Sequence, residues 1–153
     1  MRLFLLRHGH AESEAPSDDL RPLSARGEME LNTLLQENYA NIGVVDRIFV
    51  SPYLRTRQTA EVVAQYISAP QEFSERLVPD ARIDLLLEQL QQWSSAHASI
   101  MLVSHQPLVG TLLDELGGFE YGCYRMGTGA LAALTGDPLA RGCCELLWLK
   151  QPQ

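Results

Sequence analysis

The stretch LFLLRHGHAE, residues 3–12, decides how this chain folds. It begins with four consecutive apolar residues, a run typical of a strand that is buried on both faces. A cation and an imidazole, Arg7 and His8, follow at once with no turn residue between them. Neither side chain suits an apolar core, so we expect the strand to deliver both to a functional site at its end.

Segments typical of helices and strands alternate along the rest of the chain. A polar loop from His8 to Leu23 is followed by a predicted helix over 24–40, with Ser24 as its N-cap. Apolar residues recur in this helix at broadly helical spacing, namely Met29, Leu31, Leu34, Leu35 and Tyr39. We expect further helices over 52–67, 82–93 and 107–116, the last of them closed by Gly117 and Gly118.

Four more segments are typical of strands. They cover residues 47–50, 99–103, 129–136 and 143–150, and we expect the last two to pair with each other. Alternating strands and helices of these lengths predict a three-layer α/β sandwich, in which helices flank a mostly parallel sheet. With no repeat and no linker, the chain is expected to form a single domain over 1–153.

Composition limits the function classes. The chain has 153 residues, is 46% hydrophobic, and carries a formal net charge of −7. This acidity argues against binding to nucleic acid or to an acidic membrane surface, because both need a basic face. The apolar runs are too short for a membrane span or a signal peptide, so we expect a cytoplasmic protein. The oligomeric state stays open, with a monomer as the simplest expectation.

Three predicted strands end in residues suited to phosphate. Arg7 and His8 follow the first strand, Arg55 lies in the first turn of a helix after the second, and His105 follows the strand over 99–103. The carboxyl ends of parallel strands meet at one edge of a sheet. Helix N-termini and planar guanidinium groups both favour phosphate oxygens. The sequence therefore predicts a phosphate site at this edge.

These motifs resemble the histidine phosphatase superfamily, also called phosphoglycerate-mutase-like. The resemblance is carried by Arg7-His8-Gly9, by the SPxxRxxQTA pattern over 51–60, and by His105. It is strongest to the SixA-type phosphohistidine phosphatases, through RPLS over 21–24 and SHQPLVG over 104–110. The resemblance implies a phosphoglycerate-mutase-like core. One departure from the family pattern argues against mutase chemistry, because Ala11 and Glu14 stand where mutases carry a hydroxyl and an amide residue.

The resemblance also implies a mechanism. A neutral His8 would attack phosphorus while Arg7, Arg55 and a protonated His105 hold the phosphoryl oxygens, and water would then hydrolyse the phosphohistidine enzyme. No cofactor and no metal ion would be needed. We expect Arg21 either to contact the substrate or to brace its own loop.

Two further roles concern a contact with the substrate and the general acid. We expect Gln106, beside the second histidine, at the substrate. A general acid is less well marked, because Glu75, Asp80 and Asp84 all lie between the two halves of the motif. Asp80 is the preferred candidate because it lies at a predicted strand-to-helix loop. A helix N-cap is the alternative role for it.

The length between the motifs bears on the substrate. The 49 residues from 56 to 104 that separate Arg55 from His105 leave no room for an inserted helical cap. We therefore expect an open site that accepts a phosphohistidine on another protein, such as a histidine-phosphotransfer domain of a signalling relay. If the loop over 10–23 folded across the site, a pocket for small phosphate esters would result instead.

Two other readings are weighed against this one. A binding module could capture phosphohistidine without turnover, although an anion receptor needs no nucleophile. A metal hydrolase of the amidohydrolase-barrel type could use His8 and His10 as ligands. That barrel, however, needs about 250 residues, and Arg7 would repel a metal ion. We expect His10 and Arg57 to be ordinary loop and surface residues.

Overall fold

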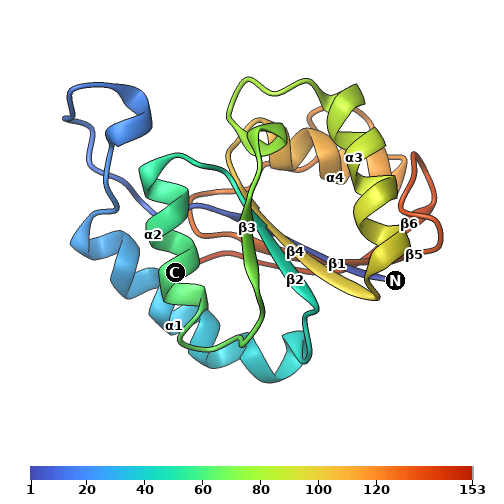
Figure 1. The fold of residues 1–153 in the computed structure, drawn as a ribbon, viewed down its shortest axis with the longest axis horizontal. Coiled ribbons are helices and arrows are strands. Elements are labelled where there is room, and N and C mark those ends of the chain that lie inside the picture. The colour runs from blue at the N-terminus through green and yellow to red at the C-terminus, as the bar shows by residue number, and fades with distance from the viewer. Residues whose placement is uncertain (153) are drawn as a thin grey trace.

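One sheet of six strands, in the order β3-β2-β4-β1-β5-β6, organises the computed structural model, which describes residues 1–152 (Figure 1). Strands β1 to β4 run parallel, whereas β5 is antiparallel to both β1 and β6. The α/β prediction with a mostly parallel sheet is confirmed. The strands are β1 (Arg2–Arg7), β2 (Arg47–Val50), β3 (Gln71–Phe73), β4 (Ser99–Ser104), β5 (Leu131–Gly136) and β6 (Cys144–Lys150).

Helices cover both faces of this sheet. Figure 1 shows α1 and α2 on one side of the strands and α3 and α4 on the other. Each side has its own cluster of buried apolar side chains against the sheet, so the sandwich has three layers. The helices are α1 (Ala25–Ile42), α2 (Leu54–Val63), α3 (Ile83–Ala96) and α4 (Leu108–Gly117), with short 3-10 turns η1 (Asp18–Leu20) and η2 (Glu75–Leu77).

Capping residues and apolar patterns in the sequence predicted most of these helices and strands correctly. Ser24 caps α1, since its hydroxyl accepts the Gly27 N–H, and Gly118 ends α4 with a left-handed φ of 68°. Helix α2 is shorter than expected because it begins at Leu54, two residues after Pro52, and ends at Val63. Strand β3 was not predicted, because its three residues are all exposed and carry no apolar pattern.

Two apolar residues of α1 lie outside the core. Met29 is 68% exposed and Tyr39 is 50% exposed, whereas Leu31, Leu34 and Leu35 are buried. The apolar spacing that predicted the helix was therefore correct, but it overestimated the width of the buried face. The buried residues of α1 recur mostly three or four positions apart on one face of the helix, and Met29 and Tyr39 fall outside that face.

The strand register brings the predicted site residues together. Strand β4 lies between β1 and β2, with Ser104 opposite Arg7 and Val103 opposite Val50. Beyond the strand ends the backbone stays linked: the His8 N–H donates to the Ser104 carbonyl at 3.0 Å, and the Ser51 N–H donates to the Val103 carbonyl at 3.0 Å. All three chain segments therefore leave the sheet at the same level, facing one crevice.

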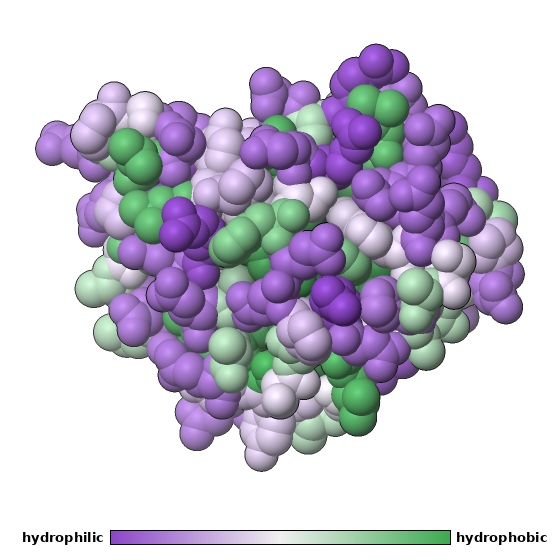
Figure 2. Space-filling view, viewed as in Figure 1, coloured by the Kyte–Doolittle hydropathy of each residue, from purple (hydrophilic) through white to green (hydrophobic). Residues whose placement is uncertain are grey.

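The segment between α2 and β4 belongs to the sandwich. Within it, α3 buries Leu86 and Leu90, and Trp93 stacks on Phe49 of β2 with ring centroids 3.9 Å apart. Helix α3 therefore packs against the sheet, whereas η2 lies at the end of β4, where the Ser104 hydroxyl donates to the Leu77 carbonyl at 2.6 Å. The face in Figure 2 is mostly hydrophilic with scattered apolar residues, and among residues 1–152 no helix is long and apolar enough to cross a membrane.

Candidate active site

His8 is oriented as a nucleophile. Its ring Nδ1 lies 2.8 Å from the Gly9 carbonyl oxygen, which can only accept, so Nδ1 carries the proton and Nε2 carries a lone pair. Burial lowers the pKa of His8 to about 4; the bond to Gly9 opposes this shift, and the charges of Arg55 and Arg7 add to it. The imidazole is therefore neutral at physiological pH, as a nucleophile must be.

Arg55 is held by three hydrogen bonds. Its Nε donates to His8 Nε2 at 3.3 Å, its Nη1 donates to the Asp18 carbonyl at 2.6 Å, and its Nη2 donates to an Asp18 carboxylate oxygen at 3.1 Å. The residue is 4% exposed and lies in the first turn of α2. One edge of the guanidinium group thus faces His8, so the structure brings together these two residues of the sequence motif.

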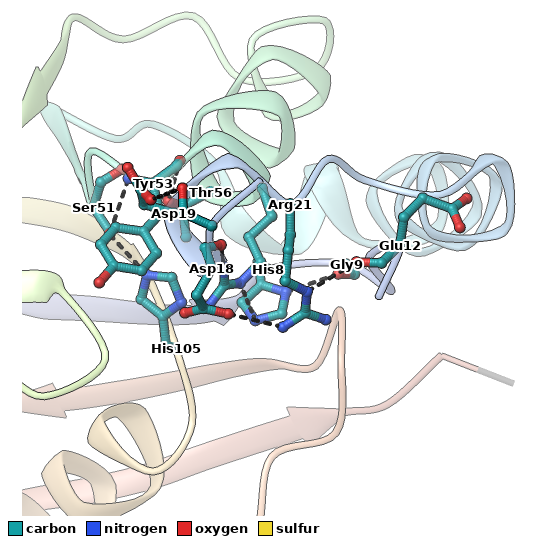
Figure 3. Close-up of polar contacts among 12 residues, drawn as sticks. His8, Gly9, Glu12, Asp18, Asp19, Arg21, Ser51, Tyr53, Thr56 and His105 are labelled. Atoms are coloured by element: carbon teal, nitrogen blue, oxygen red, sulfur yellow. Dashed lines mark hydrogen bonds and ion pairs between the residues drawn. The ribbon is translucent and has the colours of Figure 1, made fainter. Parts of the chain in front are cut away.

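Asp18 belongs to this cluster, although the sequence did not mark it. Besides Arg55, its carboxylate accepts a bond from Arg21 Nη1 at 3.1 Å (Figure 3). Burial alone would raise the pKa of Asp18, but the bonds from Arg21 and Arg55 hold that pKa below its usual value. An acidic residue in a loop rich in Asp, Glu and Ser gives no sequence signal, so only the fold reveals that it contacts both arginines.

Arg21 braces the loop that carries Asp18. In addition to the ion pair with Asp18, its Nε donates to the Glu12 carbonyl at 2.8 Å. The loop over 10–23 therefore reaches the site from the α2 side and forms one wall of it. Of the two roles expected for Arg21, the structure shows the bracing contacts, and its role toward the substrate stays a prediction.

His105 lies across the crevice from His8, with ring centroids 5.2 Å apart. Its Nε2 is 2.7 Å from the Ser51 hydroxyl, and its Nδ1 is buried with no partner among residues 1–152. Burial lowers the pKa of His105 to about 3, and the charges of His8 and Arg55 add to the shift. Burial beside two arginines therefore favours a neutral His105 in the ligand-free site, whereas the protonated His105 was expected around a bound phosphoryl group.

Arg7 completes the cluster at the end of β1. Its Nη1 donates to the Met126 carbonyl at 2.9 Å, whereas its Nε is buried without a partner in the described residues. Burial lowers the pKa of Arg7, and the charge of Arg55 adds to this, yet a guanidinium group stays charged at neutral pH. A buried cationic donor without a partner is suited to an anion.

A groove of about 550 Å³ runs from Arg7 along the start of α4. Gln106 lines it, together with residues of the segment 121–127. The Gln106 side-chain oxygen accepts the Gly110 N–H at 3.2 Å, so its amide nitrogen remains available for another bond. Gln106 is thus placed beside the cluster, as expected, and its contact with substrate stays a prediction.

The three general-acid candidates differ in their surroundings, and Asp80 lies near Tyr53, whose ring packs against His105. Asp80 is exposed in the turn before α3, and its charge acts on Tyr53; the N-cap of α3 is Arg82, so the alternative cap role for Asp80 is wrong. Asp84 pairs with Arg82 at 2.6 Å, and Glu75 lies in η2. None of the three hydrogen-bonds to His8 or His105 in the described chain.

The two histidines of the HxH pattern point to different partners. His10 Nδ1 lies 2.7 Å from the Ser24 hydroxyl, whereas His8 Nδ1 bonds to its neighbouring carbonyl. Among residues 1–152 no three His, Cys, Asp or Glu side chains come together as a set of metal ligands. The cluster at the strand ends is instead two guanidinium groups and two neutral imidazoles around one crevice.

Comparison with known proteins shows which family this chain belongs to. The model of the histidine phosphatase superfamily (branch 1) matches residues 3–78. The phosphohistidine phosphatase SixA of Escherichia coli (strain K12) is 35% identical over 119 residues, which cover 76% of this chain and 74% of that protein. A SixA homolog of Haemophilus influenzae is 31% identical over 128 residues, which cover 77% of this chain and 78% of its own length.

Solved structures agree with the sequence matches. The structure of the protein histidine phosphatase SixA complexed with tungstate superposes with a TM-score of 0.89 at 32% identity, covering 99% of this chain and 97% of that one. The match therefore extends through both halves of the motif, from β1 to β6. The chain belongs to the histidine phosphatase superfamily and is a phosphatase of the histidine-phosphatase type with a SixA-like fold.

Proposed function

We propose that this protein hydrolyses phosphohistidine on another protein through a phosphoryl group carried by His8. The observation that carries the proposal is the orientation of the His8 ring, whose Nδ1–H is fixed by the Gly9 carbonyl while the Nε2 lone pair faces Arg55. A module that only bound phosphate would need donors at this position, and a lone pair there would repel the anion.

The proposed reaction has two steps, transfer of the phosphoryl group to His8 and its hydrolysis, and neither step needs a strong general acid. His8 Nε2 forms a bond to phosphorus as the bond from phosphorus to the substrate imidazole breaks, and an imidazole protonated on its other nitrogen leaves as a neutral molecule. Water then attacks the phosphoryl group, the bond to Nε2 breaks, and His8 returns with its proton still on Nδ1. The proton of the attacking water leaves with inorganic phosphate. Arg7, Arg55 and His105 supply donors to the oxygens throughout.

The leaving group explains why a protein phosphohistidine fits this site. An alkoxide needs protonation as it departs, whereas the structure places Asp80 in an exposed turn and engages Asp18 with two arginines. The carboxyl ends of the strands lie uncovered by α3, and a groove continues from Arg7 past Gln106. A histidine on the surface of a partner, such as a histidine-phosphotransfer domain, could enter with its flanking residues along that groove.

One observation favours a second candidate function. The loop over 10–23 reaches the site, with Asp18 bonded to Arg55 through both its carbonyl and its carboxylate. A wall on that side narrows the crevice and could help to hold a small phosphate ester. Hydrolysis of small phosphate esters by the same His8 chemistry is therefore the alternative.

A substrate panel separates the two functions. We would compare kcat/KM for a phosphohistidine-bearing phosphotransfer domain with kcat/KM for 3-phosphoglycerate, a sugar phosphate and a chromogenic phosphate ester, each with and without EDTA. We expect the phosphoprotein to be preferred, EDTA to have no effect, and His8→Ala to abolish turnover. His97→Ala is the matched control, because the His97 ring lies beside the Phe49 ring, away from the site. A clear preference for the small esters would establish the alternative instead.

A further inference from the structure

Ser51 and His105 form a buried pair, and of the two only His105 has a part in the proposed mechanism. Ser51 is fully buried and His105 is 1% exposed, and the distance from the Ser51 hydroxyl to His105 Nε2 is 2.7 Å. Figure 3 shows the imidazole lying between Ser51 and the side of the crevice that holds Asp18 and His8. The opposite ring nitrogen, Nδ1, is the buried atom left without a partner in residues 1–152.

The hydrogen atoms of this pair can be assigned. A serine hydroxyl has one hydrogen to donate and lone pairs to accept with. The Tyr53 N–H points at the Ser51 oxygen from 3.4 Å, so the hydroxyl already has a donor facing it. The Ser51 carbonyl is in turn fixed by the Thr56 hydroxyl at 2.8 Å, which holds the start of this turn in place. Among the described residues 1–152 the Ser51 oxygen has hydrogen-bond contacts only with the Tyr53 N–H and His105 Nε2, so His105 Nε2 is the one acceptor within reach of the hydroxyl hydrogen.

We propose that Ser51 is a positioning residue that holds His105 in its neutral tautomer with the proton on Nδ1, so that His105 donates one uncharged hydrogen bond to a phosphoryl oxygen. Nε2 accepts from Ser51, and Nδ1–H is the one donor of a neutral ring. This inference rests on the proposed function, since a phosphoryl group is the acceptor that Nδ1 lacks in the resting site.

The surrounding charges favour the neutral ring. His105 faces His8 and Arg7 from the end of β1, Arg55 from α2 and Asp18 from η1, while the Tyr53 ring packs edge-on with centroids 5.0 Å apart. Burial is the largest influence and lowers the pKa of His105, His8 and the arginines lower it further, and Asp18 alone opposes them. A neutral donor binds the phosphoryl group without adding a third cation that would retain the phosphate product.

Nuclear magnetic resonance of the ring nitrogens tests this without turnover. In full-length protein labelled with ¹⁵N, we expect His105 Nε2 to be unprotonated and Nδ1 protonated from pH 8 to pH 5, with and without inorganic phosphate. Ser51→Ala should shift the ring toward the Nε2–H tautomer and lower kcat about tenfold, the loss of one hydrogen bond of about 1.4 kcal/mol, with a smaller change in KM. Ser51→Thr, which keeps the hydroxyl, should restore both the tautomer and the rate.

Ser104→Ala is the matched control, because the Ser104 hydroxyl is also buried but donates to the Leu77 carbonyl. We expect it to leave the His105 tautomer unchanged. An imidazolium or an Nε2–H ring in the wild type at pH 7, or an unchanged tautomer in Ser51→Ala, would overturn the inference. The expected spectra together with no activity on phosphohistidine would instead overturn the proposed substrate alone.

Discussion

Arg55 directs its Nε at His8 Nε2 over 3.3 Å while both of its terminal nitrogens are bonded to Asp18. The guanidinium group is therefore already aimed at the atom that carries the phosphoryl group in the proposed mechanism. When a phosphoryl group arrives at Nε2, its oxygens replace the imidazole lone pair as the acceptor for this donor. The site is thus arranged before substrate binds, which is the condition under which electrostatic stabilisation is most effective.

Arg55→Lys should lower kcat/KM by roughly 10²–10³-fold, as for the loss of one oxyanion-hole donor. A lysine ammonium keeps the charge but cannot hold Asp18 with one edge and face His8 with the other. Steady-state kinetics on the phosphoprotein measure this. Arg57→Lys is the matched control, because Arg57 lies in the same helix but faces outward over the Phe73 ring. Equal activity of the two variants would contradict the claim that Arg55 must contact Asp18 and the phosphoryl site at the same time.

Asp18→Asn should separate catalysis from phosphate binding. An amide has one acceptor oxygen for two arginines, so Arg55 loses part of its anchoring and kcat should fall about tenfold, the scale of one charged hydrogen bond. The carboxylate also competes with phosphate for Arg55, so inorganic phosphate should inhibit the variant at lower concentration. Inhibition constants and kcat measured together check this. A parallel loss of kcat and phosphate affinity would show that Asp18 serves only to keep the loop folded.

The buried histidines should make the protein less stable in mild acid. Both His8 and His105 have lowered pKa values, about 4 and about 3, in the folded state. As the pH falls below the unfolded value near 6.5, the unfolded chain binds protons that the folded chain does not, so the free energy of unfolding must fall. The slope should approach about 1.4 kcal/mol per pH unit for each histidine.

Urea unfolding at a series of pH values from 7 to 4.5 measures this slope. The double variant His8→Gln, His105→Gln should show a flatter dependence over that range, since it has neither group to titrate. His97→Gln serves as the control and should follow the wild type. A wild-type profile as flat as that of the double variant would mean that the two imidazoles are not kept neutral by burial.

Fold and central residues could be predicted from the sequence because their signals are local. The apolar runs of β1 and β4 mark buried strands, and Arg7, His8 and His105 follow those runs directly. Once the strands are parallel, their carboxyl ends must lie at one edge, so convergence follows from topology. The same reasoning could not find β3, whose pairing with β2 is set by a neighbour and not by its own three exposed residues.

The supporting contacts could not be predicted because they depend on how the loop and the strand ends meet in space. Asp18 lies 37 positions from Arg55 along the chain, and Ser51 lies 54 positions from His105. Asp18 looks like any acid of a polar loop, and Ser51 appears in the sequence only as part of a motif. The charge state of His105 also required burial to be known, since an exposed imidazole would have kept its ordinary pKa.

The central claim is that His8 carries the phosphoryl group, and rapid quenching in base tests it most directly. Wild-type protein is mixed with a ³²P-labelled phosphohistidine protein, quenched in base within milliseconds, and digested so that the labelled peptide can be identified. The account predicts a base-stable, acid-labile label on the peptide containing His8, absent from His8→Ala. A label on a serine or cysteine peptide, or near-wild-type turnover by His8→Ala, would contradict it.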